Sequence, residues 1–396
     1  MNNSSLGFVK HADYEWAVSL NRYCLKINGL WPQVNHGVGS LLAKLHIIVL
    51  LIAFTLVCTI PCFCGLIMKC DNTMACMKCL GFCIPFLIIY LKYFVIYSKR
   101  RILLPVLRMI AEDWAKSKTD AEKGIMIRQG RISRAFMIFA YANTALAALC
   151  MITMPQLGNS FRLSTEESDL FPIPTYFVYD VSQSPYYEII FAVQVITIVT
   201  ASCCYIGVDH FFGLLILHIC GQLEILRTRL SNMKNSDNFD YNLMTIVLNH
   251  NQLIRAVDTI EDTYTMLLFV LFLYFGVFIC IYGLILVNMI TGEGTFSSLE
   301  LFFSLSSFTN TFVQTALYCT VGQILASQSE GVFDAAYECE WLNLKVKEAK
   351  NLMLIMARAR RPLYVTAGKI FPLTMLTFCN ILKVSFSYIS YLLTRI

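Results

Sequence analysis

Long apolar runs alternate with polar connections along the whole chain. Seven such runs lie near residues 41–68, 79–98, 134–155, 187–221, 264–291, 299–326 and 366–394. Each holds the roughly eighteen or more largely apolar residues that an α-helix needs to cross the hydrocarbon core of a bilayer. No internal repeat, low-complexity tract or linker divides the chain, which predicts a single domain over residues 1–396. The expected fold is an all-α membrane protein with seven transmembrane helices.

Two polar connections continue the helical pattern. Apolar side chains recur at helical spacing within residues 243–261 and 331–357, on stripes formed by Ile246, Leu253, Val257 and Ile260 and by Phe333, Tyr337, Trp341 and Leu344. Mixed charge beside the stripes favours helices that pack together over helices that lie flat on a membrane surface. We therefore expect a helical anchor region at one end, formed by about 219–262 and 327–364. At the other end, the aromatic and proline-rich connection 156–186 predicts a packed lid.

Basic residues gather on one side of the seven runs. Twenty-four of the thirty-one Lys and Arg lie in the first forty-four residues and in the connections 99–134, 219–262 and 327–364. The alternate segments hold Lys69, Lys78, Arg162 and Arg395, and the runs themselves hold Lys92, Lys369 and Lys383. Basic segments stay in the cytoplasm. The pattern thus predicts a cytoplasmic N-terminus and an extracellular C-terminus, the reverse of a G-protein-coupled receptor.

Bulk composition agrees with a membrane protein. Hydrophobic residues make up 57% and charged residues 14% of the chain, too apolar for a soluble protein of 396 residues. The lipid bilayer is enough to explain the net charge of +5. A nucleic-acid partner is not expected, because the sequence has no basic patch interleaved with aromatic residues. No nucleophile, zinc-peptidase or phosphate-loop motif occurs, so we expect neither an enzyme nor a bound cofactor.

The sixteen cysteines do not form a metal-binding pattern. Cys76 and Cys79 have the C-x-x-C spacing, but no second pair matches them and the nearby histidines are not at ligand spacing. We expect the cysteines to serve as small apolar side chains that pack helices. The sequence does not decide whether two of Cys70, Cys76 and Cys79 form a disulfide. Asp209 and His210 are adjacent inside a predicted span, so each should meet its own interhelical partner.

Lys92 lies near the cytoplasmic end of the second predicted span. There its ammonium group can extend along the helix to reach the membrane surface. We therefore expect a structural role for this side chain.

The outer halves of four predicted spans carry aromatic and aliphatic side chains with a few hydroxyl and amide groups. Such a set suits a cavity for a small volatile or lipid-like molecule, although aromatic stripes are also typical of plain helix packing. The candidate ligand residues are Phe86, Ile89, Tyr90, Thr144, Ala148, Met151, Phe191, Gln194, Val195, Ile198, Phe302, Phe303, Ser306 and Asn310.

The last sixty residues carry the most specific pattern. Trp341 and Leu352-Met353 are followed by Arg358-Ala-Arg-Arg-Pro362, by Ala367-Gly368-Lys369-Ile-Phe371 and by Ser385-Phe-Ser-Tyr388. Earlier in the chain, Lys92-Tyr93 precedes a basic segment that ends in Asp113-Trp114. These motifs resemble those of insect odorant receptors. The last span lacks the Thr-Tyr…Gln-Phe ending of gustatory receptors, and the short connection around Ser231–Asp240 resembles a ligand-tuning subunit rather than the longer co-receptor.

The resemblance implies a function. Tuning subunits assemble with a co-receptor into cation channels of four subunits in the plasma membrane of olfactory neuron dendrites. A small volatile odorant binds between the second, third, fourth and sixth spans. A cytoplasmic helix, here about 336–357, joins the inter-subunit anchor, and the last span lines the pore. The alternatives are a transporter of small hydrophobic solutes, which the lack of inverted repeats and midplane carboxylates disfavours, and a gustatory-type receptor channel.

Pore-facing residues follow from helical spacing in the last span. Val384, Tyr388, Tyr391 and Arg395 share one face at steps of four, three and four residues. Counted from Ala367-Gly368-Lys369, the family's narrow hydrophobic ring falls at Tyr391, with Thr394 and Arg395 just outside it. Arg395 departs from the pattern, because a cation pore should not carry a positive ring.

Overall fold

Long helices make up nearly the whole molecule. The computed structural model describes residues 12–32, 38–68, 73–116, 118–156, 171–178, 181, 183–233, 239–291, 298–339 and 344–394. Its elements are α1 (Ala12–Ile27), α2 (Val38–Phe54), the π-helical turn η1 (Thr55–Thr59), α3 (Ile60–Met68), α4 (Thr73–Lys99), α5 (Leu104–Ala115), α6 (Asp120–Gln156), α7 (Tyr186–Ser231), α8 (Phe239–Thr291), α9 (Ser298–Glu338), α10 (Val346–Ala359), β1 (Thr366–Ala367), β2 (Phe371–Pro372) and α11 (Met375–Leu393).

The predicted all-α transmembrane fold is confirmed. Six described stretches are long and apolar enough to cross a membrane: Ile47–Met68, Cys76–Lys99, Asp120–Thr153, Tyr186–Ser231, Phe239–Thr291 and Met375–Leu393. The seventh predicted span lies in α9, which is long enough but is diluted by serine, threonine and amide side chains. Several of these, including Ser304, Thr311 and Gln314, are buried against neighbouring helices rather than turned to lipid.

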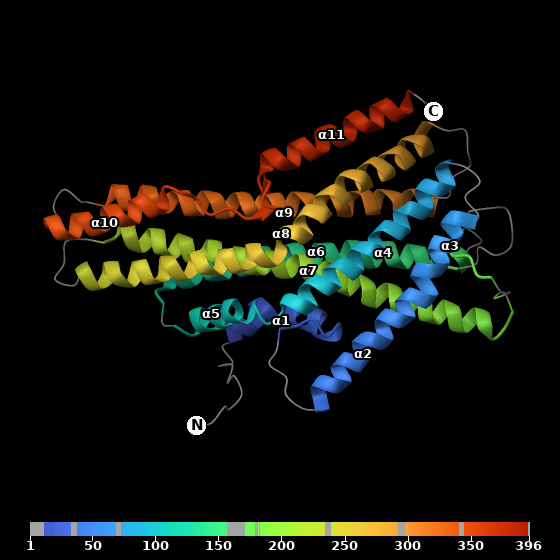
Figure 1. The fold of residues 1–396 in the computed structure, drawn as a ribbon, viewed down its shortest axis with the longest axis horizontal. Helices are drawn as coiled ribbons and strands as arrows, with labels where there is room; N and C mark the ends of the chain where they lie inside the picture. The colour runs from blue at the N-terminus through green and yellow to red at the C-terminus, as the bar shows by residue number, and fades with distance from the viewer. Residues whose placement is uncertain are drawn as a thin grey trace.

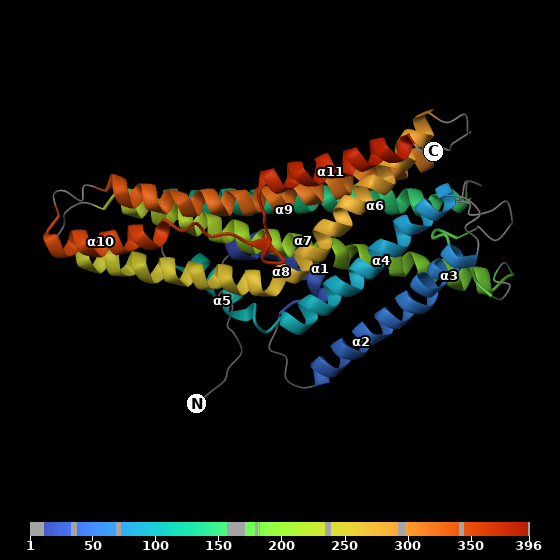
Figure 2. The same cartoon turned by 45° about the horizontal axis from the view of Figure 1, so that its top comes forward.

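Three helices continue beyond the membrane-spanning bundle into a second bundle at one end. There α7, α8 and α9 run beside α10, at the left of Figure 1, and the turned view shows the same grouping (Figure 2). The predicted stripe of Ile246, Leu253, Val257 and Ile260 is buried in this second bundle. The sequence had suggested one helix over residues 331–357. The structure has two instead, because α9 ends at Glu338 and α10 begins at Val346. Trp341 lies outside the described residues.

The last predicted span is shorter than 366–394. Residues 366–372 form a small antiparallel hairpin with a left-handed turn at Gly368 and Lys369, and α11 begins only at Met375. The turn is tied to α8, because Gly368 N donates to Thr265 O at 2.8 Å and Lys369 N donates to Thr265 Oγ1 at 3.1 Å. In these bonds the N–H groups of Gly368 and Lys369 donate to α8 instead of to a carbonyl of their own helix. Figure 1 shows α11 leaving this hairpin along the outer side of α8 and α9.

A buried charge pair joins two spans inside the bundle. Lys92 on α4 is fully buried, and its Nζ lies 2.7 Å from Oδ1 and 2.8 Å from Oδ2 of Asp209 on α7. Tyr318 on α9 donates to Asp209 Oδ1 at 2.6 Å. The expectation that Lys92 reaches the membrane surface is therefore wrong. The expectation that Asp209 has an interhelical partner is correct. His210 is buried too, and its Nε2 has no hydrogen-bond partner among the described residues.

The cysteines pack helices, as expected. Neither Cys76 nor Cys79 forms a disulfide among the described residues, and Cys70 lies outside them. Cys79 does not pair with Cys76. Its thiol donates to the carbonyl of Cys62, whose Sγ lies 3.4 Å from that of Cys83. This thiol cluster joins α3 to α4.

We expect Gly322→Ala to destabilise the protein by about 1–3 kcal/mol, because a Cβ there would overlap the Leu373 backbone and displace the hairpin. The matched control is Gly124→Ala, whose Cβ meets nothing within 4 Å and which should be neutral or stabilising by up to about 1 kcal/mol. Thermal unfolding of the detergent-solubilised chain measures both. Equal melting temperatures for the two variants would contradict close packing at Gly322.

Lys92→Met or Asp209→Leu alone should destabilise the fold by about 3–5 kcal/mol, because each leaves one charge buried without its partner. The double variant should recover much of that loss, because it removes both charges together. Surface expression and melting temperature of the three variants provide the measurement. If the double variant is no better than the worse single one, the two side chains act independently.

Candidate ligand-binding cavity

A cavity of about 180 Å³ lies among the ends of the spans, next to the proposed lid. It is enclosed mainly by α4, α6, α7, α8 and α9. Its lining residues are Phe54, Gly81, Phe82, Pro85, Phe86, Ile89, Thr144, Met151, Ile173, Ile198, Ala201, Ser202, Tyr205, Tyr274, Phe278, Tyr282, Phe303, Ser307, Asn310 and Thr311. An apolar enclosure with a few convergent polar groups is typical of a small-molecule site.

Aromatic contacts give the walls a defined shape. Phe82 on α4 stacks on Phe303 of α9 with ring centroids 5.7 Å apart, and Phe54 meets Phe86 edge-on at 5.1 Å. On α8, the rings of Tyr274, Phe278 and Tyr282 follow one another at centroid distances of 5.0 and 4.6 Å. Rings held by other rings have little rotamer freedom, so the walls are organised before any ligand arrives.

Polar atoms are concentrated at a few points of the wall. The Tyr205 hydroxyl donates to Gln314 Oε1 at 3.0 Å and lies 3.3 Å from the Tyr274 hydroxyl. The Thr144 hydroxyl is buried and has no hydrogen-bond partner among the described residues. A buried hydroxyl without a partner gains free energy when a ligand oxygen or hydroxyl approaches it. The cavity therefore favours a mainly apolar ligand that carries one or two polar atoms.

The described part of the long connection covers this cavity. Ile173 contributes to the lining, and Tyr176 N donates to the Pro61 carbonyl at 2.9 Å. Gln194 of α7 is fully buried, and its side chain accepts from Ile173 N and donates to Thr175 Oγ1, both at 3.4 Å. This part of the predicted lid thus packs against the bundle.

Half of the ligand residues proposed from the sequence line the cavity. These are Phe86, Ile89, Thr144, Met151, Ile198, Phe303 and Asn310. They come from four helices that are far apart in sequence. The tertiary structure thus brings the second, third, fourth and sixth spans together at one place, as the resemblance implied.

The other half lie outside the lining. Tyr90 points to α2 and η1, with its hydroxyl 2.7 Å from Thr55 Oγ1 and 3.0 Å from Thr59 Oγ1. Ser306 donates to Asn143 of α6 at 3.1 Å, and Gln194 holds the lid. Phe302 is 39% exposed on the outside of α9. Ala148, Phe191 and Val195 are partly buried and do not line the cavity.

The contribution of α8 to the cavity was not predicted from the sequence. Tyr274, Phe278 and Tyr282 are spaced four residues apart, which places them on one helical face. This stripe was visible in the sequence, but α8 is apolar on nearly every side there, and no contrast marked the inward face. Tyr205 of α7 and Ile173 of the lid were missed as well.

The residues proposed for a pore lie on the outside of the single chain. Val384, Tyr388 and Tyr391 are 55%, 59% and 56% exposed along one side of α11. Thr394 is exposed at the end of the helix, and Arg395 lies outside the described residues. A row of large exposed apolar side chains on a membrane helix is available for contact with another subunit or with lipid.

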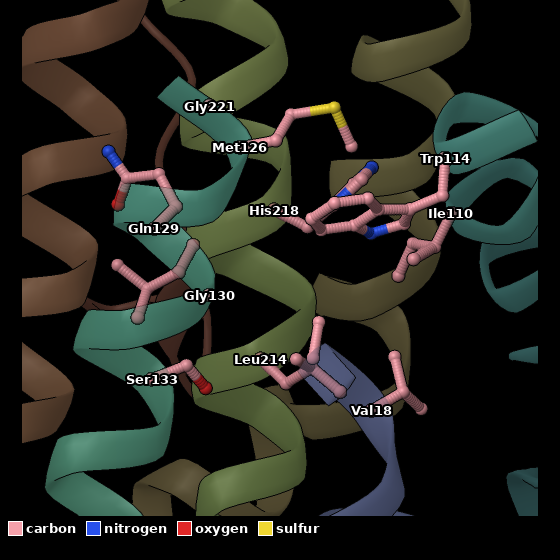
Figure 3. Close-up of a pocket in the computed structure, with 12 residues that line it drawn as sticks. Val18, Ile110, Trp114, Met126, Gln129, Gly130, Ser133, Leu214, His218 and Gly221 are labelled. Atoms are coloured by element: carbon pink, nitrogen blue, oxygen red, sulfur yellow. The ribbon is translucent and has the colours of Figure 1, made fainter. Parts of the chain in front are cut away.

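A second, much smaller cavity of about 20 Å³ lies between α1, α5, α6 and α7. Figure 3 shows Trp114, Met126 and His218 converging on it from three helices. His218 Nε2 lies 3.1 Å from Asp113 Oδ2. Burial alone would raise the pKa of Asp113, but His218 and Lys116 together hold it below its usual value. The space suits about one water molecule, so the larger cavity is the candidate ligand site.

The chain is similar in sequence to known odorant receptors. Odorant receptor 10 of Aedes albopictus is 30% identical over 225 residues, which cover 53% of this chain and 56% of that protein. Odorant receptor Or2 of Anopheles gambiae is 28% identical over 226 residues, covering 54% of this chain and 58% of that protein. The chain thus matches a little over half the length of these relatives.

The fold is also similar to that of a solved structure. The insect olfactory receptor OR5 from Machilis hrabei, solved in complex with eugenol, superposes with a TM-score of 0.82 at 16% identity, over 97% of this chain and 100% of that one. The family described as 7tm Odorant receptor matches residues 72–386, which include α4 to α10, the first part of α11 and most of the cavity lining. Because that match covers most of the sequence, this multi-pass membrane protein is a receptor rather than an enzyme and belongs to the odorant receptor family.

Proposed function

We propose that this chain is the odorant-binding subunit of a ligand-gated, non-selective cation channel. The observation that carries the proposal is the apolar cavity of about 180 Å³ with a few polar groups in its wall. An apolar protein cavity of about 150 Å³ accommodates benzene. The cavity is therefore of the right size for a volatile with about one ring, and the eugenol held by the Machilis hrabei receptor supports a ligand of this class.

Helix α8 connects the cavity to the last helix. Its Tyr274, Phe278 and Tyr282 line the cavity, while Gly276 and Cys280, on another face, contact α11. Ser385 Oγ of α11 donates to the Gly276 carbonyl at 3.2 Å, and Cys280 Sγ donates to the Ser385 carbonyl at 3.5 Å. A ligand that displaces the α8 aromatics therefore also shifts the surface on which α11 rests.

The last helix lines the pore in this proposal. Val384, Tyr388 and Tyr391 face the counterparts of neighbouring subunits, and the ring near Tyr391 forms a constriction too apolar for a hydrated ion. Odorant binding shifts the population from the closed to the open bundle. A co-receptor completes an assembly of four subunits in the dendrite membrane. The excess of Lys and Arg in alternate segments supports a cytoplasmic N-terminus and an extracellular C-terminus. In this proposal, the bundle that includes α10 anchors the subunits to one another.

Phe303→Ala should weaken the odour response about ten- to a hundredfold in concentration, because a lost aromatic contact in a dry cavity costs about 1.5–3 kcal/mol. Phe302→Ala is the matched control. It removes the same side chain one residue away, outside the cavity, and should leave the dose–response curve in place. Current recordings from cells that express the chain with the co-receptor measure the effect, with surface labelling to check expression. Equal shifts for both variants at equal surface levels would favour general packing and argue against the cavity as the odorant site.

Tyr391→Ala should raise basal current or alter ion selectivity while odour affinity stays nearly unchanged, because the change thins the constriction far from the cavity. Phe386→Ala provides the control, because this aromatic is 51% exposed on a different face of α11. Whole-cell currents without odorant, together with reversal potentials, give the measurement. Unaltered basal current and permeability at normal surface levels would make Tyr391 an interfacial anchor in lipid and remove it from the pore.

A further inference from the structure

A polar cavity unrelated to the odorant site lies where α5 meets the bundle of α7 and α8. Its volume is about 40 Å³, and Met109, Asp113, Lys116, Lys118, Gln222, Ile225, Leu226, Arg229, Ile246, Asn249, Gln252 and Leu253 line it. Three of these residues are basic and one is acidic. In the proposed topology this cavity faces the cytoplasm, just beyond the membrane.

The acidic groups near this cavity are already engaged. Asp113 accepts from Lys116 at 3.0 Å and lies 3.1 Å from His218. Glu122 accepts from Arg229 Nε at 2.6 Å. Neither carboxylate makes a hydrogen bond or ion pair with Lys118. Among the described residues, the half-buried Lys118 ammonium has no such partner at all.

The electrostatics around Lys118 are unfavourable as they stand. Burial lowers the pKa of Lys118, and the charges of Arg229 and Lys116 lower it further, while Asp113 and Glu122 oppose them. Burial is the largest of these influences, and the two carboxylates do not restore the pKa to its ordinary value. A bound anion would favour the charged form of the lysine.

Further donors converge on the same space. Arg229 uses its Nε for Glu122, and no described residue accepts from its two terminal nitrogens. The Gln222 Nε2 group is buried and has no hydrogen-bond partner among the described residues. The donors are the Lys118 ammonium, the terminal nitrogens of Arg229 and the Gln222 amide. Together they exceed what the two oxygens of a carboxylate ligand can accept. A phosphate group, with three or more acceptor oxygens, matches them.

We propose that the cavity between α5, α7 and α8 binds a phosphate group, held by Lys118, Arg229 and Gln222. Its volume suits about three water molecules or one four-oxygen anion. The phosphate group comes from a soluble phosphate or from a lipid headgroup that enters from the adjacent membrane surface. When bound, it links the connection after α5 to α7. The proposal does not depend on odorant binding.

The test uses the purified full-length chain and inorganic phosphate as the first probe. Melting temperature is followed as phosphate replaces chloride at constant ionic strength, so that general screening stays the same. We expect a saturable rise, with the apparent affinity about tenfold weaker in Lys118→Gln because a hydrogen bond between charged groups is lost. Lys123→Gln is the matched control, because this exposed lysine pairs with Asp13 outside the cavity and its loss should leave the phosphate response unchanged.

A second arm identifies the source of the phosphate. The same proteins are placed in lipid nanodiscs with or without phosphatidylinositol bisphosphate. A rise with this lipid alone that Lys118→Gln abolishes assigns the site to a headgroup, and a rise with free phosphate assigns it to a soluble anion. If Lys118→Gln does not fold, Gln222→Leu is used in its place in both arms, because it removes the amide donor from the cavity. Identical responses of wild type and the cavity variant in both arms would overturn the proposal.

Discussion

The membrane-spanning bundle is organised around the ion pair of Lys92 and Asp209. Two opposite charges buried among apolar helices must stay in contact, because separating them would leave each in a medium of low dielectric. This requirement sets the relative positions of α4 and α7, and the Tyr318 hydroxyl extends it to α9. Lys92 also donates to the Tyr205 carbonyl at 3.2 Å, and its Nζ lies 3.3 Å from the centre of that ring. The ion pair thus positions a residue that forms part of the cavity wall.

Helix α8 connects this cavity wall to α11. The aromatic side chains of α8 line the cavity on one face, and its small residues contact α11 on another face. There Ile389 packs so closely that a Cβ at Gly283 would lie 2.5 Å from its side chain. The base of α11 is held separately, by the bonds from Gly368 and Lys369 to Thr265. One rigid helix therefore carries both the proposed ligand contacts and the support of the proposed pore helix. Motion of α8 would change both at once.

The other end of the molecule is stabilised differently. Near this end, two ion pairs join α6 to α7: the exposed Arg128 pairs with Glu224, and the partly exposed Arg229 pairs with the buried Glu122. Such pairs contribute less than buried ones and respond to salt. These pairs are therefore more open to ions in solution than the fully buried pair of Lys92 and Asp209.

Much of this protein could be predicted from sequence. Apolar run length located the spans, because a helix must be long enough to cross the bilayer, and the asymmetry of Lys and Arg predicted their orientation. Motifs near the C-terminus identified the family, and the four spans that the resemblance assigned to the ligand site contribute to one cavity. Tertiary structure alone decided which side chains line it. Inside a membrane bundle a helix such as α8 is apolar on its lipid and core faces alike, so periodicity does not reveal which face points inward. The partner of Lys92 lies on another helix, 117 residues away. Only the packing of the helices brings those two charges together, because no local pattern in the sequence records a contact over that distance.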